Sequence, residues 1–217
     1  MLKKLYYWFH KKTSRPDEQY ERSAGAWPAK IRDKVFLLCK DRAGNLLDLG
    51  CGEGIFISKL LSEKVNVTIY GVDNNESKLI RAQERLNTHH HINIILGDAV
   101  RTPFDYGFFN TVVCINFFVN LESDNQAQKI IKEISRVLSP QAKVIFEIRN
   151  SLNLLVRLKY KLAPLYDGTA NHPLRTYNLK QVNQWLKEAG LKITHTVGIG
   201  FPIKLLAPII IIEAEKC

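Results

Sequence analysis

Three glycines at alternate positions form the segment of this sequence best suited to binding a ligand. The run 46–54 reads Leu-Leu-Asp-Leu-Gly-Cys-Gly-Glu-Gly, so Gly50, Gly52 and Gly54 enclose Cys51 and one acidic residue. Because glycine has no side chain and adopts backbone angles that other residues avoid, such a turn can pass close to a ligand. If the turn follows a strand and opens a helix, backbone N–H groups also point at that ligand. The pattern therefore predicts a ligand-binding turn.

Two carboxylates further along the chain add hydrogen-bond acceptors to this site. Asp73, followed by Asn74, ends a predicted strand about 20 residues after the glycine turn, where a carboxylate can accept hydrogen bonds from both hydroxyls of a ribose. Asp98 ends the next predicted strand, and with the backbone amide of Ala99 it can bind the edge and amino group of an adenine. Ligands of open α/β sheets bind at the carboxyl ends of the strands, so these groups predict a nucleoside site.

A dinucleotide site is the competing interpretation of the glycine turn. Its usual pattern is Gly-x-Gly-x-x-Gly, whereas the spacing here is Gly-x-Gly-x-Gly. The turn also carries Glu53, whose negative charge is unfavourable beside a pyrophosphate. Both observations favour a nucleoside ligand without a pyrophosphate.

Short β-branched runs alternate with longer helical patterns, which is typical of parallel strands joined by crossover helices. Strands are predicted over residues 45–50, 68–73, 92–96, 111–116 and 142–148, with two closing strands over 191–197 and 208–213. Helices are predicted over 54–64, 76–87, 125–138 and 179–189. We expect the strands at 92–96 and 111–116 to lie in the centre of the sheet, because both are apolar.

The length of 217 residues suits a single domain covering 1–217. Residues 1–42 predict a helical cover outside the sheet. Residues 150–177 show no sustained period and are too long for an ordinary connection, so we interpret them as a substrate-cap insertion.

These segments resemble class I S-adenosylmethionine-dependent methyltransferases over roughly residues 46–147 and again after residue 177. The resemblance implies a doubly wound, Rossmann-like α/β fold: a seven-stranded, mostly parallel sheet with an antiparallel last strand and helices on both faces. It implies S-adenosyl-L-methionine as the cofactor, with Asp48 and the glycines facing its methionine part and Asn116 lining the methyl-transfer mouth. The predicted cofactor-binding set is Asp48, Gly50, Cys51, Gly52, Gly54, Asp73, Asn74, Asp98, Ala99 and Asn116.

The acceptor is constrained by a second, looser resemblance. Residues 19–24 and Trp27 resemble the N-terminal helix that covers the cofactor in small-molecule and quinone-pathway members of the family. The predicted fourth strand ends in Cys-Ile-Asn-Phe-Phe-Val, not in the Asn/Asp-Pro-Pro-Tyr type of motif of enzymes that methylate amino groups of nucleic acids. We therefore expect a small-molecule acceptor, and nucleic acid is disfavoured.

Methyl transfer from a sulfonium mainly requires alignment of the nucleophile and exclusion of water. The segment after the fourth strand lacks the histidine pair of many relatives, so no base follows from the resemblance. If the acceptor is a hydroxyl, a base helps, and His172 in the insertion is the candidate catalytic residue because its ordinary pKa lies near neutrality. The alternative is that His172 is an ordinary loop histidine, and oxygen, nitrogen and carbon acceptors all stay open.

The net charge of +10 is concentrated in two acid-free basic runs, one over residues 3–15 and one that begins at Arg149 and ends at Lys161. Both could attract an anionic partner, and the alternative is an ordinary solvated surface. Apolar residues alternate with cations between 150 and 162, and the aromatic segment 5–9 is flanked by lysines. We hypothesise that both segments contact an anionic membrane and admit a hydrophobic or lipid-linked acceptor, the alternative being ordinary packing of a cap against the domain. A function of another class is a non-catalytic RNA- or partner-binding protein on the same fold, which would show salt-dependent RNA binding without cofactor affinity.

The four cysteines lack the spacing of a zinc site, so we expect neither a metal nor a disulfide. Buried thiols are typical of a reducing compartment, which predicts a cytoplasmic location, with membrane contact as a peripheral association. The oligomeric state is left open.

Overall fold

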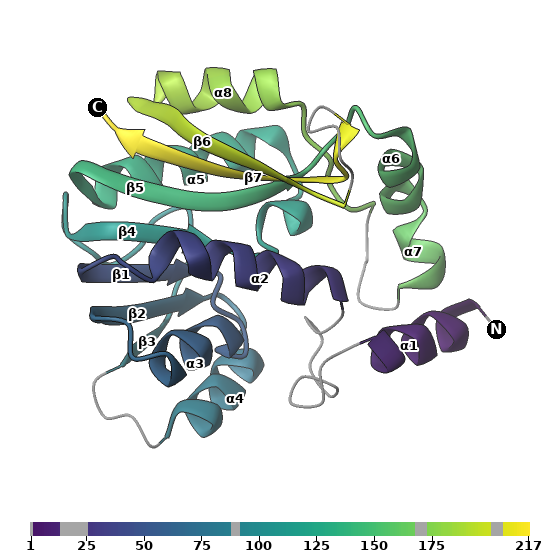
Figure 1. The fold of residues 1–217 in the computed structure, drawn as a ribbon, viewed down its shortest axis with the longest axis horizontal. Helices are drawn as coiled ribbons and strands as arrows, with labels where there is room; N and C mark the ends of the chain where they lie inside the picture. The colour runs from purple at the N-terminus through teal and green to yellow at the C-terminus, as the bar shows by residue number, and fades with distance from the viewer. Residues whose placement is uncertain (1, 14–25, 88–91, 168–172, 201–205) are drawn as a thin grey trace.

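The fold is a seven-stranded sheet with helices on both faces (Figure 1). The computed structural model describes residues 2–13, 26–87, 92–167, 173–200 and 206–217. The strand order is β3-β2-β1-β4-β5-β7-β6. The strands are β1 (Gly44–Leu49), β2 (Val67–Asp73), β3 (Asn93–Leu96), β4 (Phe109–Cys114), β5 (Leu138–Arg149), β6 (Leu191–Ile199) and β7 (Ile209–Lys216). Strands β1 to β5 pair in parallel and β7 pairs antiparallel with both β5 and β6, so the predicted fold class is confirmed.

Helices bury the sheet in two layers. They are α1 (Leu2–Thr13), α2 (Ala26–Cys39), α3 (Ile55–Ser62), α4 (Glu76–Leu86), α5 (Asp124–Val137), α6 (Leu154–Lys161), α7 (Ala163–Tyr166) and α8 (Leu179–Glu188), with a 3₁₀ turn η2 (Phe118–Asn120). One apolar cluster joins α2, α3 and α4 to a face of the sheet, and the other joins α5 and α8 to the opposite face. Among the described helices, none is both long and apolar enough to cross a membrane.

Capping residues explain where several predicted helices begin and end. Asn75 accepts a hydrogen bond from the backbone N–H of Lys78 at the start of α4, and Asn178 caps α8 in the same way. Gly190 follows α8 with a φ of 73°, the left-handed conformation that ends many helices. The predicted limits of these two helices differ from the observed ones by a single residue.

Two predictions about elements were wrong. Strand β3 lies at the edge of the sheet instead of the centre, because its four residues have one partner strand and stay half exposed. Strand β5 starts at Leu138, directly after α5, so no loop follows that helix. Within the segment 150–177, Asn153 caps α6, and α7 follows.

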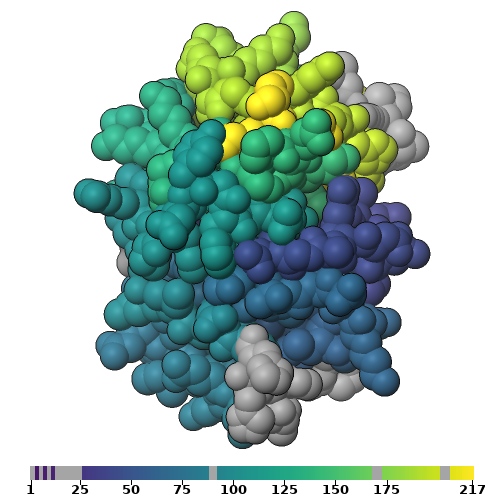
Figure 2. Space-filling view, turned by 90° about the vertical axis from the view of Figure 1, so that its left-hand side faces the viewer, coloured from purple at the N-terminus to yellow at the C-terminus, as the bar shows by residue number. Residues whose placement is uncertain are grey.

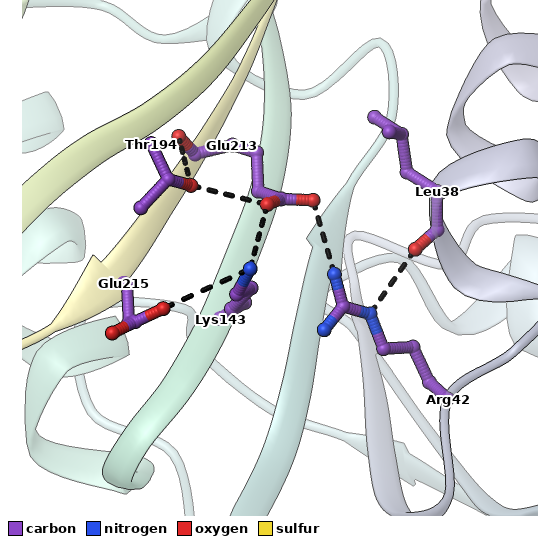
Figure 3. A network of polar contacts seen from close by, with 6 residues as sticks. All are labelled: Leu38, Arg42, Lys143, Thr194, Glu213 and Glu215. Atoms are coloured by element: carbon purple, nitrogen blue, oxygen red, sulfur yellow. Dashed lines mark hydrogen bonds and ion pairs between the residues drawn. The ribbon is translucent and has the colours of Figure 1, made fainter.

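The amino ends of the parallel strands form the face shown in Figure 2, where the yellow carboxyl-terminal residues lie among green ones. The buried carboxylate of Glu213, in the middle of β7, is the centre of a polar network (Figure 3). Its Oε1 accepts hydrogen bonds from Lys143 Nζ and Thr194 Oγ1, both at 3.0 Å, and its Oε2 accepts from Arg42 Nη2 at 3.1 Å. The network thus joins β5, β6 and β7 to the turn before β1.

Candidate cofactor site

A pocket of about 240 Å³ lies at the carboxyl ends of β1, β2, β3 and β4. It holds far more than a water molecule, which occupies about 30 Å³ in the liquid. The predicted cofactor residues that line it are Gly50, Asp73, Asn74, Asp98, Ala99 and Asn116. The pocket therefore brings together residues from three strand ends and the turn after a fourth, as the sequence predicted.

Asp73 ends β2 and organises the loop around the pocket. Its Oδ2 accepts a hydrogen bond from the backbone N–H of Gly52 at 2.9 Å, and its Oδ1 accepts from that of Asn75 at 2.9 Å. Each carboxylate oxygen can accept two hydrogen bonds, so both oxygens keep an acceptor position for a ligand hydroxyl. The side chain is thus fixed in place before any ligand binds.

The glycine turn has a different role at each end. Gly50 has a φ of 81°, and a Cβ there would lie 2.3 Å from Cδ2 of Phe117, so a side chain at this position would displace the pocket wall. Gly54 does not line the pocket; a Cβ there would lie 3.1 Å from Leu86 Cδ1. Gly54 therefore lets α3 pack closely against α4.

Two further predicted residues of the turn, Cys51 and Asp48, are buried beneath it. Cys51 belongs to the apolar cluster on the α2 face, and its Sγ would be 3.0 Å from a Cβ at Gly71. Asp48 is 2% exposed, and its pKa is raised to about 7, first by burial and then by the charge of Asp73. Neither residue is part of the pocket lining, so the expectation that Asp48 faces the methionine part of the cofactor stays a prediction.

Glu53 corrects the electrostatic argument made from the sequence. The residue is 4% exposed, and its Oε1 pairs with Arg81 Nη1 on α4 at 2.9 Å. Arg85 Nε donates to the backbone carbonyl of Glu53 at 3.0 Å. The negative charge is therefore neutralised beneath α4 and does not face the pocket, and the case against a dinucleotide rests on the glycine spacing.

Asn116 is held at the pocket by a buried charged pair. It follows β4 by two residues with a left-handed φ of 54°, and its backbone N–H donates to Glu147 Oε1 at 2.8 Å. Arg149 Nη2 donates to Asn116 Oδ1 at 2.7 Å. Because arginine only donates, the side-chain oxygen of Asn116 faces Arg149 and its NH₂ group stays available to the pocket.

The pair itself comes from β5 and reaches the insertion. Arg149 Nη1 donates to Glu147 Oε1 at 3.2 Å, and Arg149 Nε donates to the hydroxyl of Tyr160 on α6 at 3.0 Å. Burial raises the pKa of Glu147 to about 7 against the opposing effect of Arg149. The sequence placed Arg149 in a basic run that was expected to lie on the surface. The structure corrects this expectation, because Arg149 is 4% exposed.

Several pocket residues were not predicted from the sequence. They are Val72, Lys78, Gly97, Phe117, Asn120, Leu121, Glu122, Gln126 and Ile130. Those between 117 and 122 follow β4, so their place after a strand could have identified them. Ile130 could not be recognised, because its helical spacing is also that of the core residues of α5.

Other predicted features lie outside the described residues. These are His172, the candidate base, and residues 19–24, which resemble the covering helix. Within the ranges that the structure describes, no group of three or more histidine, cysteine or acidic residues could hold a metal ion.

The doubly wound sheet with acidic strand ends around one pocket defines a nucleoside-binding α/β domain. Residues 46–141 match a family model described as a methyltransferase domain. The demethylmenaquinone methyltransferase of Lactobacillus johnsonii is 33% identical over 60% of this chain and 54% of its own length. The chain spans about half the length of this and another curated relative that it matches.

Solved structures agree on the fold. The PH0226 protein of Pyrococcus horikoshii has a TM-score of 0.74 and 20% identity, covering 98% of this chain and 99% of that protein. The magnesium protoporphyrin IX methyltransferase of Synechocystis, solved with bound S-adenosylhomocysteine, has a TM-score of 0.67 and 14% identity, covering 99% of this chain and 94% of that one. Residues 46–141 thus resemble a methyltransferase domain, and the chain shares the fold of these solved structures.

Proposed function

We propose that this protein transfers a methyl group from S-adenosylmethionine to a small hydrophobic acceptor. The observation that carries the proposal is the carboxylate of Asp73, held by two backbone N–H groups at the pocket with acceptor capacity left for ribose hydroxyls. A phosphate-binding turn would instead present its N–H groups to the ligand. Here the amide of Gly52 is already bonded to Asp73, which suits a nucleoside.

The residues present fit this cofactor chemically. Asp73 would hold the ribose, Asp98 and the amide of Ala99 would hold the adenine, and the buried carboxyl of Asp48 would balance the positive methionine part. When bound, S-adenosylmethionine supplies an activated methyl group on a sulfonium. The protein then has to orient the acceptor and exclude water, and Phe117 and Leu121 are apolar parts of the pocket wall suited to the second task.

The acceptor side is assigned to the region around Asn116. Its amide NH₂, oriented by Arg149, can donate a hydrogen bond to an acceptor oxygen. A quinone-like or lipid-linked acceptor is supported by the apolar residues Phe117 and Leu121 in the pocket wall and by the similarity to the demethylmenaquinone methyltransferase named above. If the acceptor is a hydroxyl, His172 stays the proposed base.

Isothermal titration with S-adenosylhomocysteine tests the cofactor site without knowledge of the acceptor. Wild type is expected to bind with micromolar affinity, and Asp73→Asn to bind about 10- to 100-fold more weakly, since hydrogen bonds to a charged group contribute about 1.5–3 kcal/mol. Asp98→Asn should also weaken binding. Asp41→Asn is the matched control, because it removes the same charge from an exposed turn before β1.

Because Asp73 also holds the glycine turn, each variant is checked for folding by circular dichroism before titration. Absence of binding by folded wild type would overturn the methyltransferase proposal. Equal affinity of Asp73→Asn and Asp41→Asn would place the nucleoside elsewhere.

A further inference from the structure

The insertion presents an apolar helix face that the described part of the domain leaves uncovered. Leu154 and Leu155 on α6 are 71% and 81% exposed, and Leu158 and Leu162 are exposed as well. At about 3.6 residues per turn these four leucines share one side of the helix. Leu165 on α7, 63% exposed, extends the leucine face. Single exposed leucines are ordinary on protein surfaces, but a contiguous set marks an interaction site.

The flanks of this leucine face are basic. Arg157 and Lys161 follow one edge of α6 and Lys159 the other, and all three are exposed. No acidic residue occurs between 150 and 166. The opposite side of α6 faces the domain, where Tyr160 accepts the hydrogen bond of Arg149. An apolar stripe between cationic edges is the pattern of helices that lie in the interface of an anionic bilayer.

Helix α1 extends the same surface. It packs against α7, and the hydroxyl of Tyr7 donates to Asp167 Oδ1 at 3.3 Å, so the two helices lie side by side in Figure 1. Tyr7 and Trp8 are exposed, as are the lysine pairs before and after them. Tyrosine and tryptophan favour the headgroup region of a membrane, where lysines contact anionic lipids.

This surface adjoins the acceptor side of the pocket. Tyr160 of α6 is bonded to Arg149, which is bonded to Asn116 at the pocket. The backbone N–H of Arg175 also donates to the carbonyl of Val119, in η2, at 2.8 Å. A lipid surface on α6 and α7 would therefore lie next to the proposed acceptor entrance.

We propose that α1, α6 and α7 dock this protein on an anionic lipid bilayer, with the leucine face inserted and the basic residues on the headgroups. Docking goes beyond methyl transfer and requires no particular acceptor. A second copy of the chain is a poorer occupant, because two such surfaces would bring like charges together.

Co-sedimentation with sucrose-loaded vesicles tests the proposal. The probes are vesicles of phosphatidylcholine alone and of phosphatidylcholine with 30% phosphatidylglycerol. Wild type is expected to bind the anionic vesicles at least tenfold more strongly, with affinity falling as salt is raised. Leu154→Glu/Leu155→Glu should lose at least tenfold in affinity, whereas Ile80→Glu, on the exposed side of α4, should bind like wild type.

A charge-matched pair separates the basic edge from total charge. Arg157→Gln/Lys161→Gln should lose at least fivefold in affinity for the anionic vesicles. Lys180→Gln/Lys187→Gln removes two exposed charges from α8 and should bind like wild type. Binding of S-adenosylhomocysteine should be the same in all four variants, so a failed cofactor site and a failed docking surface give different results.

Three outcomes would overturn the proposal. The first is folded wild type that stays in the supernatant with anionic vesicles at low salt. The second is a dimer in light scattering that Leu154→Glu/Leu155→Glu converts to a monomer, which would make the leucine face an interface between copies. The third is tight binding of single-stranded RNA that depends on Arg157 and Lys161 and not on the leucines.

Discussion

At the scale of residues, the two acidic side chains near the glycine turn have different surroundings. Asp73 accepts hydrogen bonds from two backbone N–H groups. Asp48 is enclosed, and burial together with the charge of Asp73 raises its pKa to about 7. A carboxyl with such a pKa is partly protonated at neutral pH and must lose its proton before it can balance a cation. Ligand binding and the protonation of Asp48 should therefore be coupled.

The affinity for S-adenosylhomocysteine should rise between pH 6 and pH 8, because ionised Asp48 attracts the ammonium group of its methionine part. About a tenfold gain is expected, since one proton is released over this window. Isothermal titration in buffers of different ionisation enthalpy measures both the affinity and the number of protons released on binding. Asp48→Asn should bind weakly at every pH, whereas Asp98→Asn should keep the pH dependence. A pH-independent affinity in wild type would place Asp48 away from the cofactor.

At the scale of elements, the junction between α3 and α4 depends on Gly54. The residue precedes α3 with a φ of 73°, and a Cβ there would meet Leu86 at 3.1 Å and Ala82 at 3.3 Å. Gly190, after α8, has the same φ of 73°, but a Cβ there would meet no atom within 4 Å. An alanine at Gly190 would therefore introduce backbone strain alone, whereas an alanine at Gly54 would add a steric clash between α3 and α4.

Gly190→Ala is expected to lower the free energy of unfolding by about 1 kcal/mol, the cost of a left-handed alanine. Gly54→Ala should lower it by about 3 kcal/mol, since overpacking adds about 1–3 kcal/mol. Urea denaturation measures both. Equal losses would show that α3 and α4 shift apart without cost. A folded Gly54→Ala protein that no longer bound S-adenosylhomocysteine would return Gly54 to the cofactor-binding set.

At the scale of the whole molecule, the Glu213 network joins the antiparallel end of the sheet to its parallel part. Burial acts to raise the pKa of Glu213, but hydrogen bonds from Lys143 and Thr194 and the charge of Arg42 lower it overall. Since the pKa is lowered in the folded state, the ionised carboxylate stabilises the fold above its unfolded pKa. This stabilisation is lost as the pH falls through the lower, folded value.

Glu213→Gln should therefore destabilise the protein by about 1–3 kcal/mol at pH 7, the cost of leaving charged partners without their acceptor. Below the folded pKa the difference from wild type should shrink. Glu215→Gln is the control, because Glu215 is half exposed and 3.7 Å from Lys143, so less than about 1 kcal/mol is expected. Urea denaturation from pH 7 to pH 3 measures the effect, and a pH-independent loss would contradict a role for the charge.

The sequence by itself determined the features that are local. The strand and helix periods, the caps Asn75 and Asn178, and the acidic residues at strand ends all depend on neighbours a few residues away. The order of the crossover units then placed Asp73 and Asp98 at one edge of the sheet, because parallel strands end on the same side. The pocket was predictable for the same reason.

Only the tertiary structure decided features that depend on distant partners. The negative charge of Glu53 does not act on the pocket, because it pairs with Arg81. Arg149 is buried beside Asn116 and does not lie on the surface. Strand β3 lies at the edge because it pairs with β2 alone, and this pairing depends on the order of strands in the whole sheet. The leucines of α6 have the spacing of core residues, and only the absence of a covering element in the described structure makes their face a surface. Burial and pairing depend on contacts across the fold, and a sequence pattern does not contain them.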